Sequence, residues 1–269
     1  MEWLFPTFAY LSACVICDRG KFRDHNQDNY YLSGLYRGKV SEPNRAEVTG
    51  EKRVLHAKLP ALLAVADGMG GEQYGEEASF TVVEALRDAG KEQSKASLME
   101  TLEECNRRVC ALRESRGGVM CGTTFAGVCL RCDRALIVNV GDSRIYLFRK
   151  SKLKLLTHDD TRVQMFLDAG LLDQQEASVH PDRNVLMQYL GLFPNEGRIK
   201  PHFKELRLRK GDLFLLCSDG LHSMIENSRI EELLAASTSI EEKADALFYA
   251  AMDAGGKDNI TIILAKIST

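Results

Sequence analysis

The segment Ala61-Leu-Leu-Ala-Val-Ala-Asp67-Gly-Met-Gly-Gly71 joins an apolar run of strand length to an acidic, glycine-rich end. A short apolar run bounded by turn residues is typical of a strand buried on both faces. Asp67 stands at the end of the run. Gly68 tolerates dihedral angles that could turn its carbonyl oxygen inward beside the carboxylate. The segment therefore predicts a buried strand that delivers oxygen ligands to one edge of a sheet.

Further aspartates stand at the ends of other expected strands. An aspartate in such a place more often caps or solvates a loop, so each one alone indicates little. Together they can converge on one site if their strands are neighbours in one sheet or sandwich. They are Asp28 just beyond the first expected strand, Asp142 after the run 136–141, Asp219 after the run 213–218 and Asp258 just before the run 259–267.

A cluster of carboxylates suits a particular kind of metal ion. Mg²⁺ and Mn²⁺ prefer carboxylate, carbonyl and water oxygens to thiolate or imidazole. Two such ions bridged by one carboxylate can generate hydroxide and hold a phosphoryl group for in-line displacement. The aspartates are therefore compatible with a centre of two or more cations, which could carry out phosphoryl chemistry.

The remaining pattern mixes strands with amphipathic helices. Helical periodicity is clear at 75–90 and at 98–113, and the second of these follows a capping box formed by Ser97 and Glu100. A third helix at 240–254 repeats that device with Ser239 and Glu242, and a shorter one opens at Thr161 and ends at Gly170. The polar segment 34–58 is expected to be a long hairpin or a surface excursion. Strands are expected near 9–17, 61–66, 123–130, 135–140, 144–149, 212–217 and 259–267.

Composition excludes several classes of protein. The chain has 269 residues, enough for one large domain, and a formal net charge of −3. Because no basic surplus exists, neither nucleic acid nor an anionic membrane surface is an expected partner. No apolar run reaches the length of a membrane span. The apolar start of the chain lacks the basic region and cleavage site of a signal peptide.

Two pairs of cysteines, Cys14/Cys17 and Cys129/Cys132, have the spacing of zinc ligands. Both pairs lie in expected strands, where residues i and i+3 point to opposite faces and cannot chelate one ion. Reduced, buried thiols of a cytoplasmic protein are the simpler interpretation.

Cys17 also forms a Cys-x5-Arg pattern with Arg23, which is the phosphate loop of cysteine-dependent phosphatases. In that chemistry a thiolate of low pKa would be the nucleophile. Asp24 follows the arginine where Ser or Thr usually stands, and its charge would repel phosphate. No helix begins inside the loop to supply a dipole. The thiol mechanism is therefore the weaker alternative.

Six short motifs occur in order along the chain. They are Arg23-x-x-Asn26-Gln27-Asp28, Asp67-Gly68-Met69-Gly70-Gly71, Gly122-Thr123-Thr124, Gly141-Asp142-Ser143-Arg144, Ser218-Asp219-Gly220-Leu221 and Asp258-Asn259-Ile260-Thr261. Each motif alone is weak, but the ordered set resembles the metal-dependent protein phosphatases of type 2C (the PPM family), especially their compact bacterial members. The match spans residues 23–261, which is nearly the whole chain.

The resemblance implies a metal centre built from five residues of these motifs. Asp67 would bridge two catalytic cations, with the carbonyl oxygen of Gly68 on one of them. Asp219 and Asp258 would complete the other cation. Asp142, together with Asp219, would form a third and looser metal site.

Two further residues acquire catalytic roles through the same resemblance. Asp28 would hold metal-bound water, directly or through a hydrogen bond. Arg23 would bind the substrate phosphate, for which a guanidinium fork is well shaped. The motifs Gly122-Thr123-Thr124 and Ser143-Arg144 are interpreted as architectural.

The implied fold is α+β: a sandwich of two antiparallel β-sheets with helices on both outer faces, in four layers αββα. Residues 1–269 would form a single catalytic domain, with a flap region at about 161–195 beside the site. The implied activity is hydrolysis of phosphoserine and phosphothreonine in proteins, with a metal-bound water or hydroxide attacking phosphorus. Mn²⁺ or Mg²⁺ would be the cofactor, and a serine/threonine kinase would be among the phosphoprotein partners of a cytoplasmic monomer.

Three positions depart from the family pattern. Gln27 stands where many members have a glutamate near the metal, so one negative charge is lost. Met69 replaces the histidine that eukaryotic members often have, as is common in bacterial members. The segment 156–160 resembles a motif that usually ends Asp-His, whereas here it ends Asp159-Asp160, and His158 within it is interpreted as a loop histidine.

Two other functions remain open at this stage. A pseudophosphatase would bind phosphoproteins without turnover, although retention of Asp67, Asp219 and Asp258 argues against it. Hydrolysis of another phosphoester, such as a nucleotide, would use the same metal chemistry.

Overall fold

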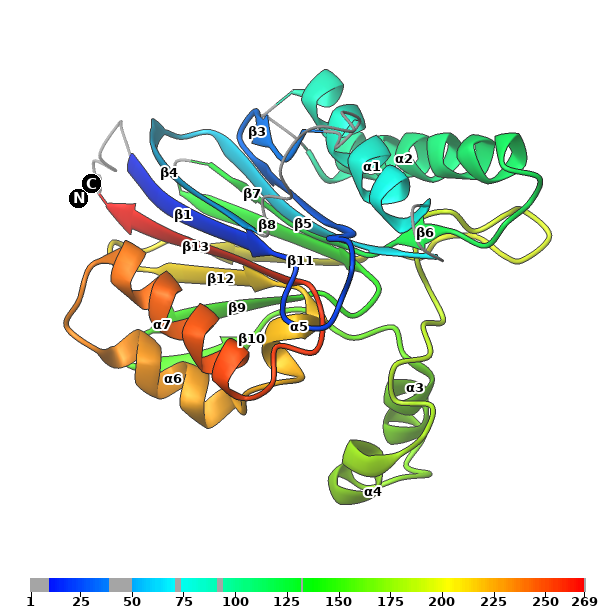
Figure 1. The fold of residues 1–269 in the computed structure, drawn as a ribbon. Coiled ribbons are helices and arrows are strands. Elements are labelled where there is room, and N and C mark those ends of the chain that lie inside the picture. The colour runs from blue at the N-terminus through cyan, green and yellow to red at the C-terminus, as the bar shows by residue number, and fades with distance from the viewer. Residues whose placement is uncertain (1–9, 39–49, 71–73, 91–93, 132, 269) are drawn as a thin grey trace.

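Two antiparallel sheets pack face to face in the computed structural model, which describes residues 10–38, 50–70, 74–90, 94–131 and 133–268 (Figure 1). The six-stranded sheet has the order β10 (Lys152–Leu155), β9 (Arg144–Arg149), β12 (Leu213–Cys217), β13 (Ile260–Ser268), β1 (Tyr10–Asp18) and β4 (Gly50–Lys58). The seven-stranded sheet has the order β11 (His202–Arg207), β8 (Arg134–Val140), β7 (Phe125–Leu130), β5 (Ala61–Met69), β2 (Asp28–Leu32) and β3 (Leu35–Tyr36), with β6 (Gly122–Thr123) paired to β5.

Helices cover the outer face of each sheet, as Figure 1 shows. Apolar residues of α1 (Tyr74–Ala89) and α2 (Lys95–Ser115) pack on the seven-stranded sheet. Those of α6 (Asn227–Ala235) and α7 (Ile240–Asp253) pack on the six-stranded sheet. The prediction of a four-layer sandwich of two antiparallel sheets is confirmed.

Strand β1 illustrates how alternation along one strand builds two cores. Its residues Leu11, Val15 and Cys17 face the other sheet and join the core between the sheets. The intervening Cys14 and Ile16 face the opposite way and join the core beneath α6 and α7. Successive side chains of a strand point to opposite faces, so an almost wholly apolar strand is what a sheet covered on both sides requires.

Two of the expected helix starts can be compared with the structure. The capping box of α7 is confirmed: Glu242 N–H donates to Ser239 Oγ at 3.1 Å, and Ser239 N–H donates to Glu242 Oε2 at 2.8 Å. The expected cap of α2 at Ser97 was wrong. The helix begins at Lys95 with Ser94 as its cap, whose side chain accepts the Ser97 N–H at 3.0 Å.

The expectation of a hairpin or surface excursion over 34–58 was partly wrong. Residues 50–58 form β4, an edge strand that pairs with β1 along its whole length. Its side chains alternate between half-buried and exposed, so it lacks the apolar run by which the buried strands are recognised. Residues 39–49 of that segment lie outside the described part of the chain.

Helices α3 (Arg162–Asp168) and α4 (Gln174–Val179) lie apart from the sandwich, below its right-hand end in Figure 1. Thr161 caps α3 by accepting the Gln164 N–H at 3.1 Å, as the sequence predicts. Among the described residues, no helix combines the length and the apolar character needed to cross a membrane.

Leu63 of β5 is fully buried between the two sheets, and it provides a test of this core. We expect Leu63→Ala to lower the free energy of unfolding by about 2–5 kcal/mol, because it removes buried methyl groups and leaves a cavity. The same substitution at Leu171, which is 69% exposed, should change it by less than about 0.5 kcal/mol. Denaturant unfolding of the two variants measures both values, and equal losses would contradict the assigned core.

Candidate metal centre

A pocket of about 450 Å³ lies where β5 meets the ends of β8, β12 and β13. Its lining joins residues that are far apart in the sequence and come from both sheets. Of the residues singled out from the sequence, those that line it are Arg23, Asp67, Gly68, Asp142, Asp219 and Asp258. The structure thus brings together all but one of the predicted site residues in a single cavity.

The exception is Asp28, which is fully buried and is paired with Asp67 in the antiparallel ladder between β2 and β5. Its Oδ2 accepts the hydroxyl of Ser218 at 2.7 Å, and Ser218 Oγ in turn accepts the Thr261 N–H at 3.0 Å. Its Oδ1 is buried and has no hydrogen-bond partner among the described residues. A buried carboxylate oxygen without a partner is costly, so this atom fits a cation or a bound water.

Asp67 lies inside strand β5 rather than beyond its end, because the strand continues to Met69. Its backbone is fixed by the Gly122-Thr123-Thr124 motif. Asp67 N–H donates to Thr124 Oγ1 at 3.0 Å, and Thr123 Oγ1 donates to the Asp67 carbonyl at 2.9 Å. Ser143 Oγ lies 2.7 Å from the same Thr124 hydroxyl. The contacts show that these motif residues hold Asp67 in place.

Position 68 requires glycine because there is no room for a side chain. A Cβ at this position would overlap the carbonyl oxygens of Gly75 and Gln27. The residue is not among those with a positive φ, so the expectation that unusual dihedral angles explain this glycine was wrong. Close approach of β5 to the start of α1 and to the 19–27 loop is the physical reason.

Burial, followed by mutual repulsion, sets the electrostatics of the pocket. Burial raises the pKa of Asp67 well above its ordinary value, and repulsion by Asp28 and Asp219 raises it further. The pKa of Asp219 is raised well above its ordinary value by burial and then by repulsion from Asp142 and Asp258. Burial raises the pKa of Asp28 to about 6. Carboxylates held this close favour either a proton or a divalent cation between them.

Asp142 occupies the side of the pocket next to β9. Burial, and then repulsion by Asp159, raises its pKa to about 7. Its carbonyl accepts the Nε2–H of the half-buried His222 at 3.1 Å. Arg144 forms an ion pair with Asp159 at 2.6 Å, which agrees with an architectural role for Ser143-Arg144.

Arg23 lies at the mouth of the pocket. Its Nη2 forms an ion pair with Asp258 Oδ2 at 2.6 Å, while 55% of its side chain remains exposed. The loop that carries it is fastened by Asn259, whose Nδ2 donates to the carbonyls of Arg19 and His25 at 2.9 and 3.0 Å. Asn259 Oδ1 also accepts the Gln27 N–H at 2.8 Å.

Three positioning residues were not assigned a role from the sequence: Ser218, Asn259 and His222. Ser218 and Asn259 were visible as neighbours of Asp219 and Asp258 within quoted motifs, and that adjacency was the available signal. His222 follows the Ser218-Asp219-Gly220-Leu221 motif, but only the fold shows that its ring reaches the carbonyl of Asp142.

The rival thiol chemistry is not supported. Cys17 is fully buried in the core between the sheets, and burial raises its pKa to about 12, so no thiolate forms at neutral pH. Cys14 faces the opposite side of β1, which excludes joint zinc binding by this pair. Cys132 of the second pair lies outside the described residues.

The departures from the family pattern can also be placed. Gln27 Nε2 donates to the carbonyl of Gly70 at 3.0 Å, so this side chain ties the loop to the end of β5. Met69 lines the pocket. His158 and Asp160 lie outside the pocket lining.

Comparison with known proteins identifies the class. The family model described as protein phosphatase 2C matches residues 52–254. The serine/threonine phosphatase stp of Listeria monocytogenes is 33% identical over 258 residues, covering 93% of each chain. The chain is also 35% identical over 255 residues to the Mycobacterium tuberculosis serine/threonine protein phosphatase PstP, covering 93% of this chain and 44% of that protein.

Solved structures of serine/threonine phosphatases have the same fold as this chain. The M. tuberculosis PstP/Ppp structure superimposes with a TM-score of 0.80 at 31% identity, covering 97% of this chain and all of that one. A PstP catalytic domain in complex with two manganese ions superimposes with a TM-score of 0.78 at 30% identity, covering 97% of this chain and 100% of that one. The fold is shared with these serine/threonine phosphatases. This chain belongs to the protein phosphatase 2C family.

The raised pKa values predict an unusual pH dependence for the metal-free protein. Asp28, with a pKa of about 6, and Asp142, with a pKa of about 7, keep protons in the folded state that the unfolded chain releases near its ordinary value of 3.8. Their contribution to stability is therefore present below pH ~4 and is lost as the pH rises to ~7.

We expect the melting temperature of chelator-treated protein to be higher at about pH 5 than at about pH 8, as measured by calorimetry. Asp142→Asn should reduce this difference because it removes one of the titrating groups. A wild-type melting temperature that rises over the same interval without metal would contradict the assigned repulsion.

Proposed function

We propose that this protein is a metal-dependent protein phosphatase whose pocket holds divalent cations, Mn²⁺ or Mg²⁺, between Asp67, Asp219 and Asp258. Its relatives are named serine/threonine phosphatases, and the chain is a protein serine/threonine phosphatase by family. The observation that carries the metal proposal is the convergence of acidic residues from both sheets on one cavity. The all-oxygen donor set suits hard cations.

Each carboxylate has a distinct proposed task. Asp67 and the carbonyl of Gly68 would hold the two catalytic ions, with Asp219 and Asp258 as further ligands. Asp142 and Asp219 would hold a third ion. The partnerless Oδ1 of Asp28 supports its task of orienting a water molecule beside the ions.

The reaction follows from these tasks. Two divalent cations, when bound, supply an activated water as nucleophile and offset the negative charge of the phosphoryl group. Arg23 binds the phosphate and aligns phosphorus with the nucleophile. Its side chain is 55% exposed, which leaves the guanidinium free to contact a phosphate at the mouth of the pocket. The buried Asp28 keeps the nucleophilic water oriented. The serine or threonine oxygen leaves on the open side of the pocket, where it takes a proton from solvent.

The segment 161–195 is proposed to act as a flap within a single catalytic domain. Four of its residues, Asn184, Val185, Leu186 and Tyr189, line the pocket. Val185, Leu186 and Tyr189 add apolar surface beside the aspartates of the same lining. A peptide that carries the phosphate can pack against this surface while its phosphate reaches the acidic residues.

The substrates are proposed to be phosphoproteins, including a serine/threonine kinase that the enzyme opposes. We further propose that the protein acts as a monomer in the cytoplasm. Support for a reducing compartment comes from the free thiols of Cys14, Cys17, Cys105, Cys110, Cys121 and Cys217.

Metal dependence is tested by phosphate release from a phosphothreonine peptide with Mn²⁺, with Mg²⁺ and with chelator. We expect chelator to abolish the activity. Mutation of a residue that hydrogen-bonds to a metal ligand typically lowers activity roughly 10- to 100-fold. Because Asp67 and Asp219 are proposed as the ligands themselves, Asp67→Asn and Asp219→Asn should lower kcat/KM by more than that. Asp245→Asn, an exposed aspartate paired with Lys52 at 2.6 Å, is the matched control and should keep wild-type activity.

Robust activity in chelator, or in both pocket variants, would contradict the mechanism. A parallel assay with a nucleoside monophosphate separates the alternatives. Faster hydrolysis of the nucleotide than of the peptide would favour another phosphoester as substrate, and binding without turnover of either would favour a pseudophosphatase.

The role of Arg23 is tested by Arg23→Lys, which keeps the charge but loses the guanidinium fork. A hydrogen bond between charged groups contributes about 1.5–3 kcal/mol, so we expect KM to rise about 10- to 100-fold with a smaller change in kcat. Arg87→Lys on α1 is the control, because Arg87 is 50% exposed and also pairs with an aspartate, Asp88, at 3.3 Å. An unchanged KM in Arg23→Lys would contradict phosphate binding.

A further inference from the structure

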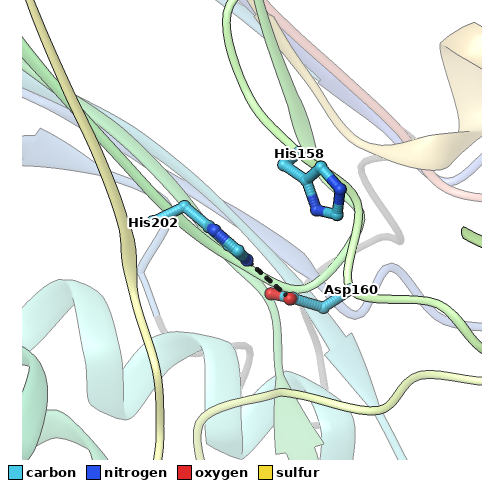
Figure 2. A group of neighbouring side chains, drawn as sticks. All are labelled: His158, Asp160 and His202. Carbon is cyan, nitrogen blue, oxygen red and sulfur yellow. Dashed lines mark hydrogen bonds and ion pairs between the residues drawn. The ribbon is translucent and has the colours of Figure 1, made fainter. Parts of the chain in front are cut away.

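A second cluster of metal-ligating side chains lies outside the acidic pocket. His158 follows β10, Asp160 precedes α3, and His202 is the first residue of β11. One ligand atom from each lies within 4.8 Å of those of the other two. Figure 2 shows the two rings and the carboxylate gathered around a common space. None of these side chains lines the pocket of the aspartates.

Two of the three ligand atoms are already in contact. His202 Nε2 lies 2.8 Å from Asp160 Oδ1, the contact drawn as a dashed line in Figure 2. The centroids of the His158 and His202 rings are 5.0 Å apart. Asp160 is only 9% exposed, whereas both histidine side chains are over 40% exposed. The carboxylate is therefore fixed, and the two rings retain the freedom to adjust toward an ion.

Asp168 orients the ring of His158. Its Nε2 lies 2.9 Å from Asp168 Oδ2, at the end of α3, and its Nδ1 is buried without a hydrogen-bond partner among the described residues. Histidines that bind metal usually donate the second ring N–H to a carboxylate, which fixes the tautomer and leaves a lone pair for the ion. A proton on Nε2 held by Asp168 leaves such a lone pair on the partnerless Nδ1.

We propose that His158, Asp160 and His202 form a binding site for a transition-metal ion of the Zn²⁺ type, separate from the aspartate centre. Two imidazoles and one carboxylate with an open fourth position suit Zn²⁺, whereas Mg²⁺ and Mn²⁺ favour oxygen ligands. Ligand atoms of a tetrahedral Zn²⁺ lie about 3.3 Å apart, given bonds of about 2.0 Å. Small rotations of the exposed rings close the cluster to that size.

The proposed ion would lie next to backbone that leads into the aspartate pocket. Asp160 also accepts the Gly141 N–H through Oδ2 at 2.9 Å, and its own N–H donates to the Gly141 carbonyl at 3.0 Å. Gly141 directly precedes Asp142 of the pocket. Through Asp168 the same cluster reaches α3. An ion bound here would connect the start of the flap segment to β11, next to Gly141. This structural role goes beyond the phosphatase function itself.

The test is Zn²⁺ binding by the full chain in competition with a chromophoric zinc chelator, with excess Mg²⁺ present to fill the aspartate pocket. We expect wild type to bind one equivalent of Zn²⁺ under these conditions. His158→Ala and His202→Ala should weaken this binding at least about tenfold, and Asp168→Asn about 10- to 100-fold. His56→Ala is the matched control, since His56 lies on β4 of the other sheet and contacts Ser12 Oγ at 3.1 Å.

A second measurement is independent of whether the variants fold. In wild-type protein labelled with ¹⁵N, one equivalent of Zn²⁺ should shift the imidazole signals of His158 and His202 and leave that of His56 in place. Absence of competitive Zn²⁺ binding in wild type, or equal binding in wild type, His158→Ala and His202→Ala, would overturn the proposal. His202 and Asp160 would then be only a hydrogen-bonded pair beside the ring of His158, with no metal function.

Discussion

Repulsion between carboxylates that are crowded into one pocket is the constraint on which the rest of the site depends. Asp28 and Asp67 face each other across two paired strands, and Asp219 and Asp258 approach from the other sheet. Burial and this mutual repulsion raise the pKa values of Asp67 and Asp219 well above their ordinary values. Such an arrangement costs folding free energy. Its natural compensation is positive charge, which Arg23 supplies in part at 2.6 Å from Asp258.

Neutral hydrogen bonds to the backbone and side chains around the pocket help the sandwich to hold these carboxylates together. Thr124 accepts the Asp67 N–H, Ser218 donates to Asp28, and Asn259 fastens the loop that carries Arg23. These residues carry no charge that would cancel the acidic field. They therefore keep the carboxylates together without reducing their attraction for a cation, which is the preorganisation that electrostatic catalysis needs.

Much of this arrangement was predictable from sequence because the decisive residues sit at the ends of apolar runs. Most buried strands and the helices with clear periodicity were found in this way, although the buried strand β2 was not, and ordered motifs indicated which aspartates belong together. Edge strand β4 was missed because its solvated face interrupts the apolar pattern. The start of α2 was misplaced because two serines in one turn can both cap a helix.

Contacts between distant segments were beyond sequence reasoning. His158 was interpreted as a loop histidine, and nothing in the chain between it and His202 signals that the two rings meet. The change from His to Asp at the end of the 156–160 motif was visible as a departure from the family pattern. Only the fold shows that Asp160 bonds both to His202 and to the backbone before Asp142.

The central claim is that the buried aspartates form a divalent-cation centre between the two sheets. Its most direct test is the anomalous diffraction of Mn²⁺ in crystals grown with that ion. The account predicts anomalous peaks inside the pocket, with one peak in contact with Asp67 and another within coordination distance of Asp219 and Asp258. Manganese found only elsewhere on the protein, with the pocket carboxylates bonded to water or to each other, would contradict it.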